Sequence, residues 1–207
     1  MHGEFGPARG LRFAILTLTA TIACSALASE PAEARWRRYR HYSAPMYQSN
    51  YAAIVVDANS GKELHAANAD ALRHPASLTK IMTLYLLFEQ LDAGKLKLDT
   101  QLKVSSHASD QSPTRIGLDE GELLKVEDAI KALVTRSAND AAVVIAEAIG
   151  GDEEAFARMM TRKARALGMT RTVYRNASGL PDDEQVTTAR DQSTLGRAIQ
   201  ERFPRYY

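Results

Sequence analysis

Cysteine is almost absent from this 207-residue sequence, since Cys24 is the only one. A single cysteine cannot form an internal disulfide, so the fold must depend on a hydrophobic core, and the length suffices for one domain. An excess of one charge sign is also lacking, because 26 Lys and Arg oppose 25 Asp and Glu and leave a net charge of +1. A general nucleic-acid binder is usually far more basic, so no nucleic-acid partner is expected. We find no metal-ligand spacing and expect no metal or cofactor.

The apolar stretch near the N-terminus is too short for a membrane-spanning helix. It covers residues 13–23, whereas a span needs about 20 apolar residues. Arg9 and Arg12 precede it and Ala26-Leu27-Ala28 follows it, an order typical of a secretory signal peptide. We therefore predict a signal peptide over residues 1–28, cleaved after residue 28 or 34, and export to the periplasm or extracytoplasmic envelope. The main alternative is an uncleaved N-terminal anchor. A lipoprotein signal is disfavoured, because residues 21–23 fit poorly before Cys24.

Residues 35–50 are basic and aromatic and show no periodicity. We interpret them as a solvated linker, although residues 35–42 could also contact an anionic envelope surface. The folded domain is expected over residues 51–207. Residues 51–57 and 62–68 flank an Asn-Ser-Gly turn and predict a β-hairpin. Helices are predicted from Ser77 to about residue 93, over 126–135, 139–149 and 152–167, and from Thr188 to before Pro204, with loops and short strands over 95–124.

Ser77 and Lys80 begin the first of these helices, directly ahead of the apolar run 81–91. Residues three positions apart share a helix face, so the lysine amine can approach the serine hydroxyl. A lysine at the start of a buried helix loses hydration, which lowers its pKa. A neutral lysine can activate a serine nucleophile without histidine. Taken alone, the Ser-x-x-Lys pattern is also compatible with an ordinary helix start.

Ser137-Ala138-Asn139 lies sixty residues after Ser77, between two predicted helices. Ser or Asn at such a junction can simply cap the following helix. Combined with Ser77 and Lys80, the pattern favours a second part of one active site. No Gly-x-Ser-x-Gly motif accompanies the five histidines, so a Ser-His-Asp triad is disfavoured.

These motifs resemble those of the low-molecular-mass penicillin-binding proteins, the serine-type D-alanyl-D-alanine carboxypeptidases. The resemblance covers residues 51–207 and is strongest at PASLTKIMT, at LVTRSANDAA, and at GLP and TARD over 179–181 and 188–191. It implies an α/β, β-lactamase/transpeptidase-like fold made of an N-terminal hairpin and a helical lobe. The later sheet strands of that fold are missing from this sequence.

The resemblance also implies a role for each residue. Ser77 would be the nucleophile that carries the acyl ester, Lys80 the general base and Ser137 the proton relay, while Asn139 would bind substrate. The implied substrate is a peptidoglycan stem peptide ending in D-Ala-D-Ala, and β-lactams would acylate the same Ser77. A class A β-lactamase is disfavoured, because no Glu-x-x-Leu-Asn stretch follows Asn139.

The third motif of the family, Lys-Thr-Gly, is absent from the sequence. In the family it supplies a cation and an oxyanion donor, and one missing donor costs about a hundredfold or more in rate. We therefore expect a chain cut short before this motif, poorly active or inactive as given. Two alternatives stay open. One is a D,D-endopeptidase of peptidoglycan cross-links, and the other is a non-catalytic module that binds muropeptides or penicillin.

Overall fold

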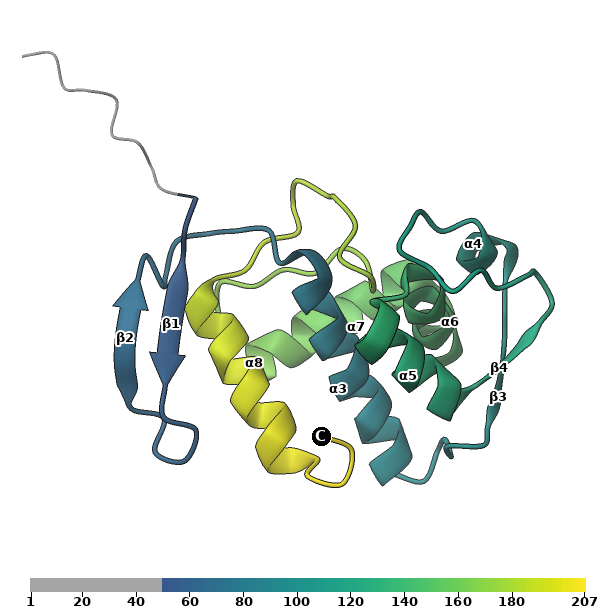
Figure 1. Cartoon of the computed structure of the whole chain (residues 1–207), viewed down its shortest axis with the longest axis horizontal. Coiled ribbons are helices and arrows are strands. Elements are labelled where there is room, and N and C mark those ends of the chain that lie inside the picture. The colour runs from purple at the N-terminus through teal and green to yellow at the C-terminus, as the bar shows by residue number, and fades with distance from the viewer. Residues whose placement is uncertain (1–49) are drawn as a thin grey trace, which may run out of the picture. The chain divides into compact units, whose positions relative to one another are not determined.

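The computed structural model describes residues 50–207 of the chain. The predicted signal peptide and nearly all of the predicted basic linker therefore lie outside the described residues. The elements, shown in Figure 1, are the strands β1(Ala53–Val56) and β2(Glu63–Ala67), the 3-10 turn η1(Ala76–Leu78), α3(Thr79–Asp92), β3(Gln101–Lys103), α4(Ser106–Ser109), β4(Leu123–Lys125), α5(Val126–Arg136), α6(Asn139–Gly150), α7(Glu153–Ala166) and α8(Ala189–Arg202).

Helix α3 is buried around most of its circumference, as its apolar sequence predicts. Nine of its 14 residues are buried, and Lys80 is the only charged one among them. The helix stops where Gly94 adopts a left-handed conformation with φ of 68° and donates to Leu91. Glycine adopts this conformation without steric cost, which is why a helix so often ends at one. The helix therefore spans the core with its polar start at one end.

Helix α6 forms the centre of the helical lobe. Its first eight residues are all buried, and it packs against α3, α4, α5 and α7. Figure 1 shows α5 and α6 on one side of α3 and α8 on the other, while α7 crosses behind α3. The start of α6 thus lies inside the molecule close to the start of α3. This proximity brings the two sequence motifs into one site.

The predicted N-terminal hairpin is confirmed. β1 and β2 pair antiparallel, with Ala53 opposite Ala67 and an irregularity between Val55 and Val56. The hairpin lies beside α8 (Figure 1). Two arginines of α8 attach it there: Arg190 binds the Glu63 carboxylate, and Arg197 donates to the carbonyl of Ala58.

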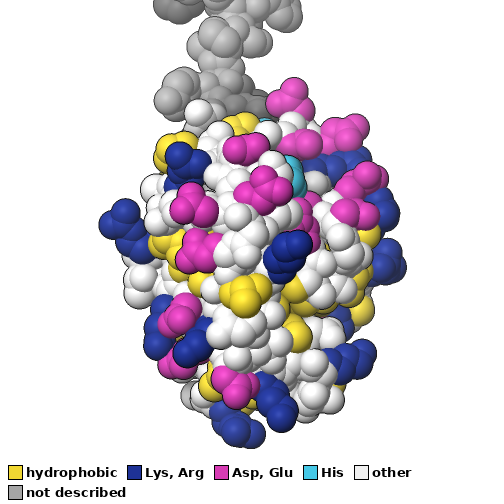
Figure 2. Space-filling view, turned by 90° about the vertical axis from the view of Figure 1, so that its right-hand side faces the viewer, with side chains coloured by type: hydrophobic (Ala, Val, Ile, Leu, Met, Phe, Trp, Pro, Cys, Tyr) yellow, Lys and Arg dark blue, Asp and Glu magenta, His cyan; other side chains and the backbone are white. Residues whose placement is uncertain are grey.

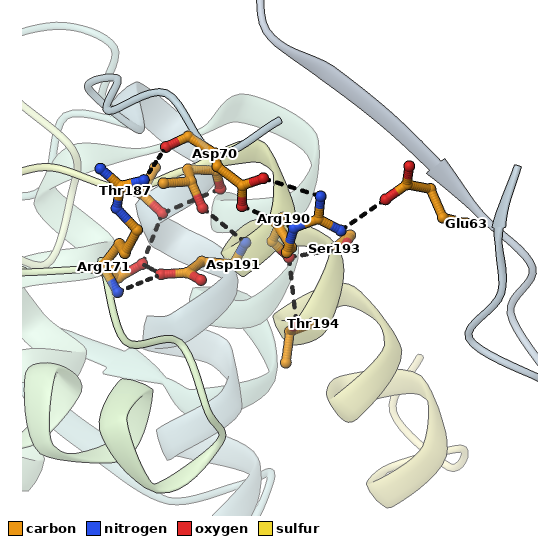
Figure 3. A network of polar contacts seen from close by, with 10 residues as sticks. Glu63, Asp70, Arg171, Thr187, Arg190, Asp191, Ser193 and Thr194 are labelled. Atoms are coloured by element: carbon orange, nitrogen blue, oxygen red, sulfur yellow. Dashed lines mark hydrogen bonds and ion pairs between the residues drawn. The ribbon is translucent and has the colours of Figure 1, made fainter. Parts of the chain in front are cut away.

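Arg190 and Asp191 connect the start of α8 to two other segments (Figure 3). Arg190 makes a bidentate pair with Asp70, with distances of 2.8 and 3.0 Å. The Thr188 hydroxyl caps α8 by accepting from the Asp191 amide, at the position where the sequence predicts the helix to start. The Asp191 carboxylate accepts from the Thr172 hydroxyl and the Arg171 amide. The helix start therefore also holds the segment around residue 172.

The segment between α3 and α5 carries a second two-stranded antiparallel sheet, β3–β4, in which Gln101 pairs with Lys125. The sequence predicts short strands here, but α4 was not expected; Ser105 caps this single turn by accepting from Ala108. The end of the molecule built from these elements is shown in Figure 2. Acidic side chains gather over its upper part, basic ones are interspersed, and apolar side chains form only small separate patches.

None of the helices in residues 50–207 combines the length and the apolar character that crossing a membrane requires.

Candidate active site

Ser77 lies in the 3-10 turn η1 that leads into α3, rather than in the first turn of the α-helix itself. The turn is introduced by buried Pro75, and Ala76 has a left-handed backbone with φ of 46°. A left-handed alanine is uncommon and costs about 1 to 2 kcal/mol, so the surrounding contacts must stabilise it. The result is an exposed Ser77 side chain presented at the surface.

The hydroxyl of Ser137 donates a hydrogen bond of 2.9 Å to the hydroxyl of Ser77. The two serines are sixty residues apart in sequence and come from different helix ends. A contact of this length lets a proton pass from one oxygen to the other. The structure thus brings together the predicted nucleophile and the predicted relay residue.

Lys80 is 4% exposed and is the second residue of α3. Its Nζ donates to Asn139 Oδ1 at 2.7 Å and to the carbonyl oxygen of Ser178 at 2.5 Å. Within the described residues it forms no ion pair with a carboxylate. Burial lowers the pKa of Lys80 from its usual value to about 8. The lysine is therefore prepared to lose a proton near neutral pH, as the sequence predicts.

The expected approach of Lys80 to Ser77 differs in detail from the observed contacts. The hydrogen bonds of Lys80 go to Asn139 and Ser178, whereas Ser77 is contacted by Ser137. Lys80 is bonded instead to the start of α6 and to the backbone at Ser178. All four predicted site residues nevertheless converge on one place.

The alternative in which Ser137 or Asn139 only caps the following helix, α6, is wrong. Ser137 is the left-handed C-cap of α5, with φ of 54°, and the N-cap of α6 is Ala138. Neither polar side chain accepts from an α6 amide; Asn139 instead bonds to Lys80 and donates its Nδ2 to the carbonyl of Ser112. The Ser137 side chain is bonded to the nucleophile and the Asn139 side chain to Lys80, not to the end of α6.

The loop over residues 175–185 forms a further wall of the site, which the sequence motifs did not predict. Its backbone accepts twice from α3, through Ser178 from Lys80 and through Ala177 from the Thr83 hydroxyl at 2.7 Å. A backbone carbonyl can come from any residue type, so the sequence gives no signal for this partner. The loop itself is shaped by the buried Gln185, whose side chain accepts from the amides of Arg175 and Asn176.

Gly179 lies directly against the turn that carries the nucleophile. A Cβ placed on this glycine would come within 1.9 Å of the Ala76 carbonyl oxygen and 3.1 Å of the Ser77 amide nitrogen. Only glycine allows this approach. A cavity of about 250 Å³ opens beside the contact, lined by residues 74–76, 179–183 and 185.

Two of the described histidines are hydrogen-bonded to groups other than Ser77. His74 bonds through Nδ1 to the carbonyl of Gln185, and His107 pairs with Glu153 at 2.8 Å. No group of described residues has the arrangement needed to hold a metal ion. The arrangement supports nucleophilic acyl transfer, with Ser77 as nucleophile and a neutral lysine as base.

The chain matches the D-alanyl-D-alanine carboxypeptidase family over residues 40–207. It is 35% identical to D-alanyl-D-alanine carboxypeptidase DacF of Bacillus subtilis over 147 residues, which are 71% of this chain and 38% of DacF. It is 32% identical to a D-alanyl-D-alanine endopeptidase of Pseudomonas aeruginosa over 190 residues, which are 90% of this chain and 57% of that protein.

Two solved structures are similar to the described fold. The D-alanyl-D-alanine carboxypeptidase DacD of Francisella tularensis matches with a TM-score of 0.74 and 36% identity, over 75% of this chain and 38% of that one. A penicillin-binding protein of Listeria monocytogenes, in its ampicillin-bound form, matches with a TM-score of 0.62 and 31% identity, over 74% and 62% of the two chains. The sequence thus spans 38% of the length of DacF and of DacD.

Proposed function

Because the chain belongs to the D-alanyl-D-alanine carboxypeptidase family, we propose that it is part of a serine D,D-carboxypeptidase that removes the terminal D-alanine from peptidoglycan stem peptides. The observation that carries the proposal is the convergence of Ser77, Lys80, Ser137 and Asn139 at the starts of α3 and α6. The complete transpeptidase-like fold of the relatives is represented here by the hairpin and the helical lobe.

The reaction proceeds by acyl transfer to Ser77. Its oxygen attacks the carbonyl carbon between the two D-alanines, and its proton passes to the neutral amine of Lys80, the general base. The Ser137 hydroxyl, 2.9 Å from Ser77 Oγ, relays a proton to the nitrogen of the departing D-alanine. Water then hydrolyses the ester on Ser77 and releases the shortened peptide.

Asn139 has two functions in this proposal. Its Oδ1 holds the Lys80 amine at 2.7 Å, and the family resemblance assigns its side chain to binding the peptide of the substrate. A β-lactam imitates the D-Ala-D-Ala carbonyl and acylates Ser77 in the same way. The ampicillin-bound state of the Listeria protein supports this extension.

Labelled penicillin tests the nucleophile. The full-length protein that contains this sequence should form a covalent adduct that survives denaturation, and Ser77→Ala should abolish this adduct. Ser109→Ala, which removes an exposed hydroxyl on α4, is the matched control and should label as the wild type does. Binding that is reversible and equal in Ser77→Ala would instead identify a non-catalytic module.

A D,D-endopeptidase is the second candidate, favoured by the match of the Pseudomonas endopeptidase over 90% of this chain. Both activities would use the same four residues. A peptide ending in D-Ala-D-Ala and a cross-linked muropeptide dimer separate them. Release of free D-alanine from the first supports the carboxypeptidase, and conversion of the dimer to monomers supports the endopeptidase.

A further inference from the structure

Asp140 is a buried carboxylate that no step of the proposed reaction uses. It directly follows Asn139 in α6 and has 0% exposure. Within residues 50–207 it forms no ion pair with a cation. An isolated buried carboxylate is very costly unless hydrogen bonds compensate for the lost hydration. Its partners therefore show what it holds in place.

All the partners of Asp140 are backbone amides, and three come from one loop. Oδ2 accepts from Ile116, Gly117 and Leu118 at 3.0, 2.8 and 3.3 Å, and Oδ1 accepts from Ile116 at 3.2 Å and from Ala141 at 2.9 Å. Three consecutive amides directed at one carboxylate form an anion-binding concavity of the kind that backbone turns provide. The carboxylate thus fixes the loop over residues 112–118 to the start of α6.

The same loop binds the Ser137-Ala138-Asn139 segment from the other side. The carbonyl of Thr114 accepts from the Asn139 amide at 2.8 Å, and the carbonyl of Ser112 accepts from Asn139 Nδ2 at 2.9 Å. The hydroxyl of Thr114 donates to the carbonyl of Ser137 at 3.0 Å. Every one of these contacts requires the loop to stay where Asp140 holds it.

Ser137 needs such support, because its left-handed backbone is strained for a residue other than glycine. A backbone that relaxed out of this conformation would turn the Ser137 hydroxyl away from Ser77. We propose that Asp140 is a positioning residue for the acyl-transfer reaction, acting through the 112–118 loop to hold Ser137 against Ser77 and Asn139 against Lys80. This inference rests on the proposed function.

The test is a double-mutant cycle on acylation by a fluorescent penicillin. It is measured in the full-length protein that contains this sequence. Asp140→Asn preserves the shape of the side chain but replaces one acceptor oxygen with a donor. It should lower the limiting rate constant of acylation about tenfold or more, because a misplaced relay loses part of the rate gain that proton transfer supplies. The apparent binding constant for the penicillin should change less than about threefold.

The second background is Ser137→Ala. Asp140→Asn should slow acylation less in this background than in the wild type, because coupled residues are non-additive and only the contribution through Asn139 and Lys80 remains once the hydroxyl is gone. Equal slowing in both backgrounds, or no slowing in either, would overturn the proposal. Asp152→Asn is the matched control: Asp152 caps α7 by accepting from Ala155, and its loss should leave acylation unchanged.

Thr114→Val keeps the inference testable if Asp140→Asn does not fold. It removes only the hydroxyl that donates to Ser137 from an exposed site, and it should show the same dependence on Ser137. Additive slowing in this variant would count against the proposal.

Hydrogen exchange keeps the test independent of the proposed function. The amides of Asn139 and of residues 116–118 should exchange at least about tenfold faster in Asp140→Asn and stay unchanged in Asp152→Asn. If the wild type is not acylated, the proposed function fails, but this exchange result still decides the link between Asp140 and the loop. Unchanged exchange would refute that link.

Discussion

The amine of Lys80 is bound by two neutral acceptors, the Asn139 amide oxygen and the Ser178 carbonyl, and it is almost fully buried. A nearby carboxylate would favour the charged amine and raise its pKa, and within residues 50–207 Lys80 forms no such pair. Burial instead lowers the pKa to about 8. Burial without a carboxylate partner is therefore what makes this lysine a usable base.

Acylation of Ser77 should consequently depend on the free amine of Lys80. Deprotonation of Lys80 proceeds as the pH rises through its pKa of about 8, so the acylation rate should increase by about tenfold per pH unit below 8 and level off above it. Stopped-flow acylation by penicillin from pH 5.5 to 10 measures the profile. Lys80→Arg should abolish acylation across this pH range, since arginine stays protonated. A flat profile in the wild type would exclude Lys80 as the base.

Gly179→Ala should disable the site through sterics. The residue has φ of 89°, and the added Cβ would meet the Ala76 carbonyl oxygen at 1.9 Å, so the turn carrying Ser77 must move. We expect acylation to fall at least about a hundredfold, in line with the sensitivity of catalysis to misplacement by about 1 Å. Acylation kinetics and thermal unfolding measure the effect.

Gly151→Ala is the control for that substitution. Gly151 has nearly the same backbone, with φ of 87°, but no atom within 4 Å of the added Cβ. It should lose about 1 kcal/mol of stability through backbone strain and keep wild-type acylation. Similar losses of acylation in both variants would show that the Ala76 contact is unimportant.

The four site residues were predictable because their function depends on side chains at informative spacings. Two recognisable pairs are present, Ser77 with Lys80 and Ser137 with Asn139. A chance match is less probable for both pairs together than for either pair alone. Ser178 contributes a backbone carbonyl, which leaves no trace in residue type. Asp140 was missed for a related reason, since its partners are the amides of a loop whose path the sequence does not show.

At the scale of elements, the end of α3 distant from the active site is fixed by an aromatic cluster. Phe203, which follows α8, packs edge-on against Tyr85 at 5.1 Å and Phe88 at 5.8 Å between ring centroids. Tyr206 stacks on Phe88 at 5.0 Å. The two helices are thus joined at this end by ring contacts, since residues 203–206 turn back from α8 onto α3.

Phe203→Ala should separate α8 from α3. Phe203 is 2% exposed, and removing a buried phenylalanine costs about 3 to 5 kcal/mol of unfolding free energy through lost burial and the cavity left behind. Urea denaturation measures the loss. Tyr207→Ala, at a residue 75% exposed, should change the free energy by less than about 0.5 kcal/mol. A loss below about 1 kcal/mol in Phe203→Ala would mean that the cluster does not stabilise the helix pair.

The long helices were predictable from their apolar periodicity and their glycine ends, and their observed bounds differ from the predicted ones by a few residues. The elements that the sequence did not show are short ones. The turn η1 and helix α4 contain three and four residues, too few for a hydrophobic stripe to repeat. Tertiary contacts determine whether such short elements form, as the packing of Gly179 against η1 illustrates.

For the whole molecule, the hairpin, the helices and the site come from segments far apart in sequence that meet around α3. The pairing of Lys80 with Ser178 spans 98 residues, and that of Arg190 with Glu63 spans 127. No local sequence pattern predicts contacts between residues so far apart in the sequence. Only the family resemblance predicted this arrangement. The hairpin and the helices follow from local patterns; their mutual placement does not.

We propose that the protein is exported to the periplasm or extracytoplasmic envelope, where peptidoglycan would be accessible, and that residues 1–28 are its signal peptide. The stretch 13–23 has the length of a signal-peptide core, and small residues at 26 and 28 suit cleavage. The mature N-terminus should therefore be residue 29 or residue 35. N-terminal sequencing of the protein recovered from the envelope fraction measures it.

Cys24 makes the competing outcomes distinguishable, because it is the only thiol in the sequence and lies before both predicted cleavage positions. A cleaved protein should yield an N-terminal peptide that starts at residue 29 or 35 and should contain no peptide with Cys24. An uncleaved anchor would retain a maleimide-reactive Cys24, and a lipoprotein would carry the mass of a lipid on Cys24. Replacing Ala26 and Ala28 with leucine should block cleavage after residue 28, since bulky residues do not fit the small-residue pattern of the site. Recovery of a maleimide-labelled Cys24 peptide from the wild type would therefore refute the signal peptide and support the anchor.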